Sequence, residues 1–98
     1  MMTKDDALRM YREGLEEEIR LHGWVSPEAE YRISGEALEA ADEADEDGAL
    51  DLWDQVLESL GPVRAAAARS HGLEEDEDGE YPYIYSLRRK EAGDGMDR

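Results

Sequence analysis

The chain has no cysteine, no long apolar stretch and few cations. Without cysteine it forms neither a disulfide nor a zinc–thiolate site, and it lacks a thiolate nucleophile. No apolar run approaches the roughly 20 residues that a membrane-spanning helix needs. The polar start of the chain also lacks the pattern of a signal peptide. These absences predict a cytoplasmic protein without membrane contact.

Cations are few in comparison with acids: 11 Lys+Arg stand against 27 Asp+Glu, which gives a net charge of −16 over 98 residues. A field of this sign repels nucleic-acid phosphates, so we expect no direct nucleic-acid contact and a basic partner instead. The length allows one domain with a thin core. We predict a single acidic domain over residues 1–90 and a disordered tail over residues 91–98.

The hydrophobic pattern predicts a mainly helical α+β fold with three to four short helices. The first helix is the best marked, because Thr3 and Asp6 have the spacing of a capping box and Gly23 follows as a left-handed cap. Its apolar stripe consists of Leu8, Tyr11, Leu15, Ile19 and His22.

Two further helices are predicted on either side of Asp47-Gly48. Ser34 is expected to cap the first, which runs from Gly35 to about Glu46. Gly61-Pro62 is expected to end the second and to begin a fourth helix, Val63 to Ser70. The expected buried faces are Ala37, Leu38, Ala41 and Ala44 before the interruption, and Leu50, Trp53, Val56, Leu57 and Leu60 after it.

A small two-stranded antiparallel pairing completes the predicted fold. Tyr81–Leu87 alternates as a strand does, and its proline favours an edge position. Its expected partner is the short segment 31–34, with a single helical turn before it at Ser26-Pro27. Glu74–Glu80, with six acids in seven residues, is predicted to be a solvated loop.

Catalytic constellations are poorly supplied. His22 and His71 each precede a glycine at a predicted helix end, where the helix dipole favours a protonated imidazole. No serine has a suggested base, and glycine-rich phosphate motifs are absent. We therefore predict a protein that is not an enzyme and that uses no cofactor.

One acidic segment approaches the spacing of a calcium loop: Glu43-x-Asp45-x-Asp47-Gly48, followed by Asp51 and Asp54. The first ligand position holds Glu where Asp is usual, and Asp54 is short for a bidentate ligand. We predict no metal site, and a calcium-binding helix-loop-helix module stays a lesser alternative.

Charge distribution is more informative than any motif. No Lys or Arg lies between Arg32 and Arg64, whereas ten acids fall within Glu36–Glu58. As a helix this segment would carry about one carboxylate per 3.5 Å, close to the ~3.4 Å phosphate spacing of one DNA strand. The candidate partner-binding residues are Glu36, Glu39, Asp42, Glu43, Asp45, Glu46, Asp47, Asp51, Asp54, Glu58, Glu74, Glu75, Asp76, Glu77 and Asp78.

In size, charge and helical acidic tracks, the chain resembles the DNA-mimic inhibitors made by phages and mobile elements, including anti-CRISPR and anti-restriction proteins. The resemblance covers Glu36–Glu58 and Glu74–Glu80 and includes no motif. It implies a competitive inhibitor that occupies the Lys/Arg-lined DNA-binding cleft of a CRISPR effector complex or a nuclease. A phage-encoded inhibitor of this kind would act in the host cytoplasm.

Other interpretations stay open. The acids, with only Lys4 and Lys90 beside nine arginines, are also typical of proteins from a salt-saturated cytoplasm. On that hypothesis the charge keeps an ordinary interaction or regulatory protein soluble. The segment Tyr31–Glu36 is faintly similar to the passage after the wing of winged-helix regulators. A homodimer through Trp53 or the tyrosine-rich strand is also compatible with the sequence.

Overall fold

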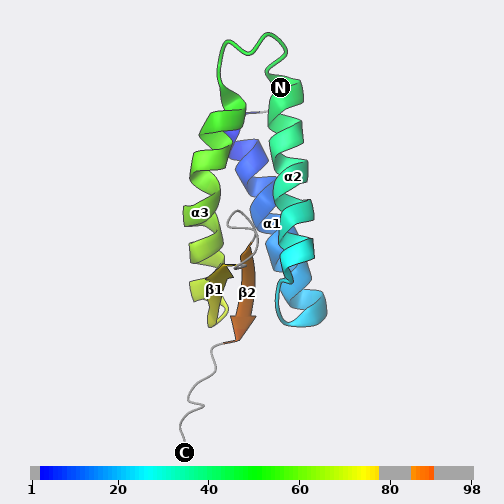
Figure 1. The fold of residues 1–98 in the computed structure, drawn as a ribbon, viewed down its shortest axis with the longest axis vertical. Coiled ribbons are helices and arrows are strands. Elements are labelled where there is room, and N and C mark those ends of the chain that lie inside the picture. The colour runs from blue at the N-terminus through cyan, green and yellow to red at the C-terminus, as the bar shows by residue number, and fades with distance from the viewer. Residues whose placement is uncertain (1–2, 78–84, 90–98) are drawn as a thin grey trace, which may run out of the picture.

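The computed structural model describes residues 3–77 and 85–89. Its elements are α1 (Lys4–His22), α2 (Pro27–Ala44), α3 (Leu52–Ser70), β1 (Leu73–Glu77) and β2 (Tyr85–Arg89). The three helices run up and down beside one another, and the two strands lie at one end of the bundle (Figure 1). The mainly helical α+β prediction is confirmed. The expectations for Asp78, for residues 81–84 and for the tail 91–98 lie outside the described residues.

Helix α1 forms as its terminal signals predict. The Asp6 N–H donates to Thr3 Oγ1 at 3.2 Å, and the Thr3 N–H donates back to the Asp6 carboxylate at 3.0 Å. Hydrogen bonding with the Thr3 backbone, and then with the Thr3 side chain, lowers the pKa of Asp6. At the other end Gly23 has φ 84°, and its N–H donates to the Ile19 carbonyl. Local capping therefore fixes both ends of α1.

Helix α2 corrects the prediction for the middle of the chain. It begins at Pro27, where Ser26 Oγ accepts from the Ala29 N–H at 3.1 Å, and it continues unbroken through residues 31–34. The expected strand at 31–34 and the cap at Ser34 were therefore wrong. The apolar face of this helix repeats at every fourth residue and is buried throughout: Ala29, Ile33, Ala37 and Ala41. Because this buried face is continuous, the β-branched Ile33 does not end the helix.

Helix α3 also runs through its expected stop and includes Pro62 in its interior. Proline removes one backbone hydrogen bond there, but the buried residues continue on both sides of it. They are Leu52, Val56, Leu60, Arg64, Ala67 and Ala68. The predicted face was wrong for Leu50, Trp53 and Leu57, which are exposed, because only the Leu52 stripe continues past Pro62 into the second half of the helix.

The strands pair differently from the prediction. β1 pairs with β2 in antiparallel register, with Leu73 opposite Arg89 and Glu77 opposite Tyr85. The acidic residues 74–77 are therefore a strand rather than the expected loop, because Leu73 is buried at its start and arginines face its acids. On its other edge β2 is bridged by Val25, whose N–H and carbonyl both bond Leu87 at 2.9 Å. The sheet thereby joins the α1–α2 turn.

The two strands pack on one end of the helical bundle. Helix α1 packs on both α2 and α3, while β1 packs on α3 and β2 packs on α2. The sheet covers the end of the α2–α3 pair that contains the start of α2 and the end of α3 (Figure 1).

None of the helices in the described ranges has the length and apolar character needed to cross a membrane.

Candidate protein-interaction surfaces

A buried polar cluster lies where the sheet meets the helices. Glu30 is only 2% exposed, and the Tyr11 hydroxyl donates to its Oε2 atom at 2.7 Å. Arg64 Nη1 donates to the Tyr11 oxygen at 3.1 Å and to Glu30 at 3.4 Å. Burial and the neighbouring Glu30 carboxylate raise the pKa of Tyr11 far above its ordinary value. The cluster pairs a charge that would otherwise be costly to bury.

The same arginine connects this cluster to the sheet. Arg64 Nε donates to Glu75 Oε1 at 2.7 Å, and the guanidinium lies 3.7 Å from the centre of the Tyr85 ring. The Tyr85 N–H also donates to Glu30 at 3.4 Å. Sequence reasoning missed Glu30 and Arg64 as core residues. One signal was available: Arg64 follows Leu60 by four residues, on the apolar face of α3.

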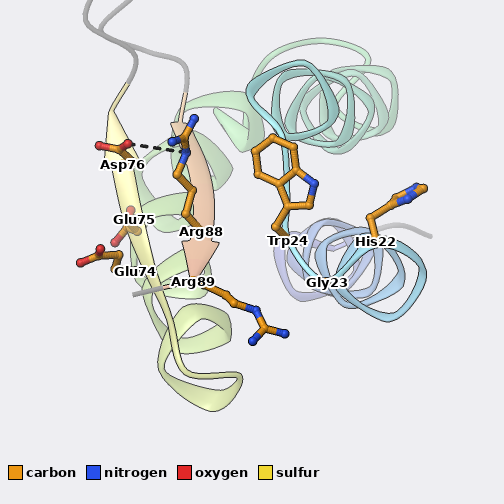
Figure 2. A pocket seen from close by; sticks show the side chains of 8 residues that line it. All are labelled: His22, Gly23, Trp24, Glu74, Glu75, Asp76, Arg88 and Arg89. Carbon is orange, nitrogen blue, oxygen red and sulfur yellow. Dashed lines mark ion pairs between the residues drawn. The ribbon is translucent and has the colours of Figure 1, made fainter. Parts of the chain in front are cut away.

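A hollow of about 750 Å³ lies between the α1–α2 turn and the sheet. Figure 2 shows the Arg88 side chain between Asp76 and Trp24. The guanidinium approaches the Asp76 carboxylate at 3.7 Å and the Trp24 ring at 5.7 Å. Charges of both signs line it, and none of its described lining residues carries a hydroxyl group: His22, Gly23, Trp24, Glu74, Glu75, Asp76, Arg88 and Arg89. The arrangement attaches β2 to the helical turn.

Both histidines lie at this same end of the bundle. His22 ends α1 and has its Nε2 3.8 Å from Glu18, while His71 caps α3 and has its Nε2 2.6 Å from Glu16. The predicted position of each at a helix end is confirmed. Neighbouring carboxylates and the negative ends of two helix dipoles therefore account for both imidazoles.

The first predicted acidic track folds back on itself. Its residues occupy the second half of α2, the connection that follows and the first half of α3, and these two helices are antiparallel neighbours (Figure 1). The carboxylates are therefore gathered at one end of the bundle instead of along a line. All ten acids except Asp45 are exposed. Within residues 3–77 and 85–89, only Glu36 among them has a cation within 4 Å, Arg32 at 3.9 Å.

Asp45 has a structural role at the turn. It is 8% exposed, and its two carboxylate oxygens accept from the N–H groups of Leu50 at 3.2 Å and Leu52 at 3.1 Å. It thereby caps the start of α3, because Asp51 at the usual capping position has φ 54° and makes no side-chain cap. Asp45 is thus engaged internally and offers no carboxylate to a partner. In the part of the chain that the structure describes, no three metal-binding side chains gather.

The second predicted run, on β1, differs from the first because arginines neutralise part of it. Glu75 pairs with Arg64 and Asp76 pairs with Arg88. Asp78 lies outside the described residues. The acids that stay without a described cation at the other end of the bundle are here called the acidic end: Glu39, Asp42, Glu43, Glu46, Asp47, Asp51, Asp54 and Glu58.

Two acids of this surface occupy unfavourable positions for the fold. Asp42 and Glu43 lie in the last turn of α2, which contains no basic residue. The negative end of a helix dipole disfavours an acid there by about 0.3–1 kcal/mol. The stability of α2 therefore does not explain these carboxylates.

Comparison of the chain with protein-family models, with curated proteins and with solved structures finds no match.

Proposed function

We propose that the protein is an inhibitor that occupies a Lys/Arg-lined DNA-binding cleft with its acidic end, as a mimic of DNA charge. The observation that carries this proposal is the gathering of eight exposed carboxylates at one end of the α2–α3 pair, with no cation within ion-pair distance among the described residues. Asp42 and Glu43 support the proposal further, because acids in the last turn of α2 lower the stability of that helix and are explained by a basic partner instead.

The layout of the acidic end supports mimicry of a duplex better than mimicry of one strand. Its carboxylates come from two adjacent helices, and packed helices lie about 8–10 Å apart. That separation lies between the minor- and major-groove widths of B-DNA, about 6 and 12 Å. Basic side chains placed to reach phosphates across a groove could therefore meet carboxylates of both helices.

The charge distribution favours this function over a general adaptation to high salt. Elsewhere several acids pair with arginines: Asp6 with Arg9 and Glu17 with Arg20 on α1, and Asp76 with Arg88 on the sheet. Solubility requires only a total charge, whereas the acidic end concentrates charge without neutralising it. On this proposal the protein acts where its DNA-binding target acts, with neither catalysis nor a cofactor.

The test is competition with DNA. A CRISPR effector complex or nuclease recovered with the protein from its native host is purified, and its DNA affinity is measured as the protein is added. Glu43→Lys, Asp54→Lys and Glu58→Lys should each weaken inhibition by tenfold or more, because each loses an attraction and adds a like-charge contact at the interface.

Glu13→Lys is the matched control, because Glu13 is an exposed acid on α1 and the charge change is the same. It should change mainly the association rate and its salt dependence. Circular dichroism confirms that each variant is folded. Equal, small effects in both sets would contradict DNA mimicry and favour the high-salt interpretation. Unimpaired DNA binding by a target saturated with this protein would also contradict the proposal.

A further inference from the structure

Another hollow, of about 400 Å³, lies between α2 and α3, and all its described lining residues belong to these two helices. On α2 they include Tyr31, Gly35 and Leu38, and on α3 the lining residue is Trp53. Tyr31 and Trp53 are both exposed, so no described residue covers this pair of aromatic side chains.

Two of the residues that line this hollow, Tyr31 and Trp53, are exposed aromatic side chains. Tyr31 is 65% exposed and Trp53 is 41% exposed, and Leu57, one turn after Trp53, is 49% exposed. Large exposed aromatic and aliphatic side chains gathered at one place are typical of an interaction site. The hollow is therefore a candidate for a docked apolar ridge.

Gly35 gives an independent indication that the hollow is open. A glycine inside a helix costs about 0.5–1 kcal/mol relative to alanine. A Cβ at Gly35 would meet no atom within 4 Å, so packing within the described fold does not require glycine. Gly14 on α1 is the opposite case, because its Cβ would lie 2.6 Å from Ile33 Cγ2. The missing side chain at Gly35 instead leaves room in the hollow.

The charges around the hollow define the partner. Glu36 and Glu39 line it on α2. On α3, Asp54 follows the exposed Trp53 by one position, and Glu58 follows the exposed Leu57. Arg32, the one cation among the described lining residues, pairs with Glu18 at 3.1 Å and with Glu36 at 3.9 Å. An apolar stripe between acids on both helices is complementary to an apolar stripe between cations.

We propose that this hollow binds an amphipathic basic helix, with an apolar ridge against Trp53 and Leu57 and with Lys or Arg on both sides of that ridge. This inference rests on the proposed function and specifies which element of the DNA-binding target the inhibitor binds. A helix lying in a groove between two helices is a common recognition mode. A second copy of this chain fits poorly, because each copy carries a charge of −16 and would oppose acids to acids.

The experiment uses two synthetic peptides of about 18 residues, or five helical turns. One carries leucines in a helical stripe flanked by lysines, and the other has the same composition in an order that breaks the stripe. Binding is followed by the fluorescence of Trp53 in a Trp24→Phe variant and by calorimetry at about 0.15 M salt. We expect the striped peptide to bind at least tenfold more tightly than the scrambled peptide.

Gly35→Leu fills the hollow and should reduce this preference at least tenfold, while Gly35→Ala, the matched control, should keep it. Equal affinity for the two peptides, or full preference in Gly35→Leu, would overturn the inference. Shielding of Trp53 from acrylamide in the free monomer would also overturn it, because other residues of the chain would then fill the hollow. A dimer that Trp53→Ala dissociates would make a second copy the occupant.

The inference and the proposed function fail in different ways. Loss of the peptide preference with DNA competition intact removes only the helix-binding inference. Retained peptide preference without any competition against DNA removes the mimicry and leaves a helix-binding protein.

Discussion

The two ends of the α2–α3 pair use acidic residues in opposite ways. At the sheet end, buried Glu30 and the β1 residue Glu75 both contact Arg64. At the acidic end, eight exposed carboxylates have no described cation near them. The difference shows that the fold neutralises some of the acids at the sheet end, whereas the eight carboxylates of the acidic end have no described partner.

Burial explains why the sheet end must be balanced. A buried carboxylate loses its hydration, and only a partner charge with good hydrogen bonds offsets that loss. Exposed carboxylates keep their hydration, so water and counterions tolerate them without partners. Neutralisation at the sheet end is therefore a requirement of folding, whereas the charge of the acidic end is free to serve binding.

The largest expected effect comes from breaking the balance at the sheet end. Arg64→Met should cost about 3–5 kcal/mol of unfolding free energy, because it leaves Glu30 buried without a cation. For a domain of this size that loss is a large part of the total stability. Urea denaturation followed by circular dichroism measures it.

The double variant Glu30→Gln with Arg64→Met provides the control. It removes both charges, so its stability should exceed that of Arg64→Met alone. A single variant as stable as the parent protein would show that water reaches Glu30 and that the sheet end is not a sealed cluster.

The sequence predicts those parts of the fold that depend on local signals. Thr3, Asp6 and Gly23 fix α1 through bonds within a few residues, so their pattern could be interpreted correctly. The course of the chain through Ile33 and Pro62 depends instead on burial against other helices, which local propensity does not include. Likewise, residues 74–77 form a strand because Arg64 and Arg88, distant in sequence, face them.

The candidate site follows the same division. The absence of cations between Arg32 and Arg64 is visible in the sequence, and it locates the acidic end. The capping role of Asp45 depends on how the turn brings its carboxylate to the N–H groups of Leu50 and Leu52. The charge pattern alone therefore grouped Asp45 wrongly with the exposed acids. The exposure of Trp53 depends on which of two apolar stripes α3 buries, and this choice is made by the residues beyond Pro62.

A smaller effect distinguishes the face of α2 that packs on Gly14 of α1, at Ile33, from the open face of α2 at Gly35. Gly14→Ala should destabilise the protein by about 1–3 kcal/mol, because its methyl group would press on buried Ile33. Gly35→Ala should stabilise it by about 0.5–1 kcal/mol, because it favours the helix and meets no neighbour. Thermal melting of the two variants measures both signs.

The double variant Gly14→Ala with Ile33→Ala tests the cause of the first effect. Because the smaller side chain makes room for the added methyl group, the two changes together should cost less than the sum of the single changes. Strict additivity would mean that α1 and α2 are not in close contact at this point.

The smallest expected effect tests whether the acidic end is maintained against the stability of the fold. Asp42→Lys and Glu43→Lys should each raise the unfolding free energy by about 0.3–1 kcal/mol, because a cation suits the last turn of α2. Glu28→Lys is the matched control, because the same charge change in the first turn of α2 should lower stability by a similar amount. Urea denaturation at about 0.1 M salt resolves the two signs.

Salt then distinguishes electrostatics from packing in these variants. The stability of the parent protein should rise with sodium chloride, because screening weakens repulsion among the carboxylates of the acidic end. The advantage of Asp42→Lys should shrink as the Debye length falls from about 10 Å at 0.1 M to about 3 Å at 1 M. An advantage that persists at 1 M would come from helix propensity. An Asp42→Lys variant less stable than the parent at low salt would show that the carboxylate serves the fold, and the case for a surface shaped by its partner would lose its main energetic support.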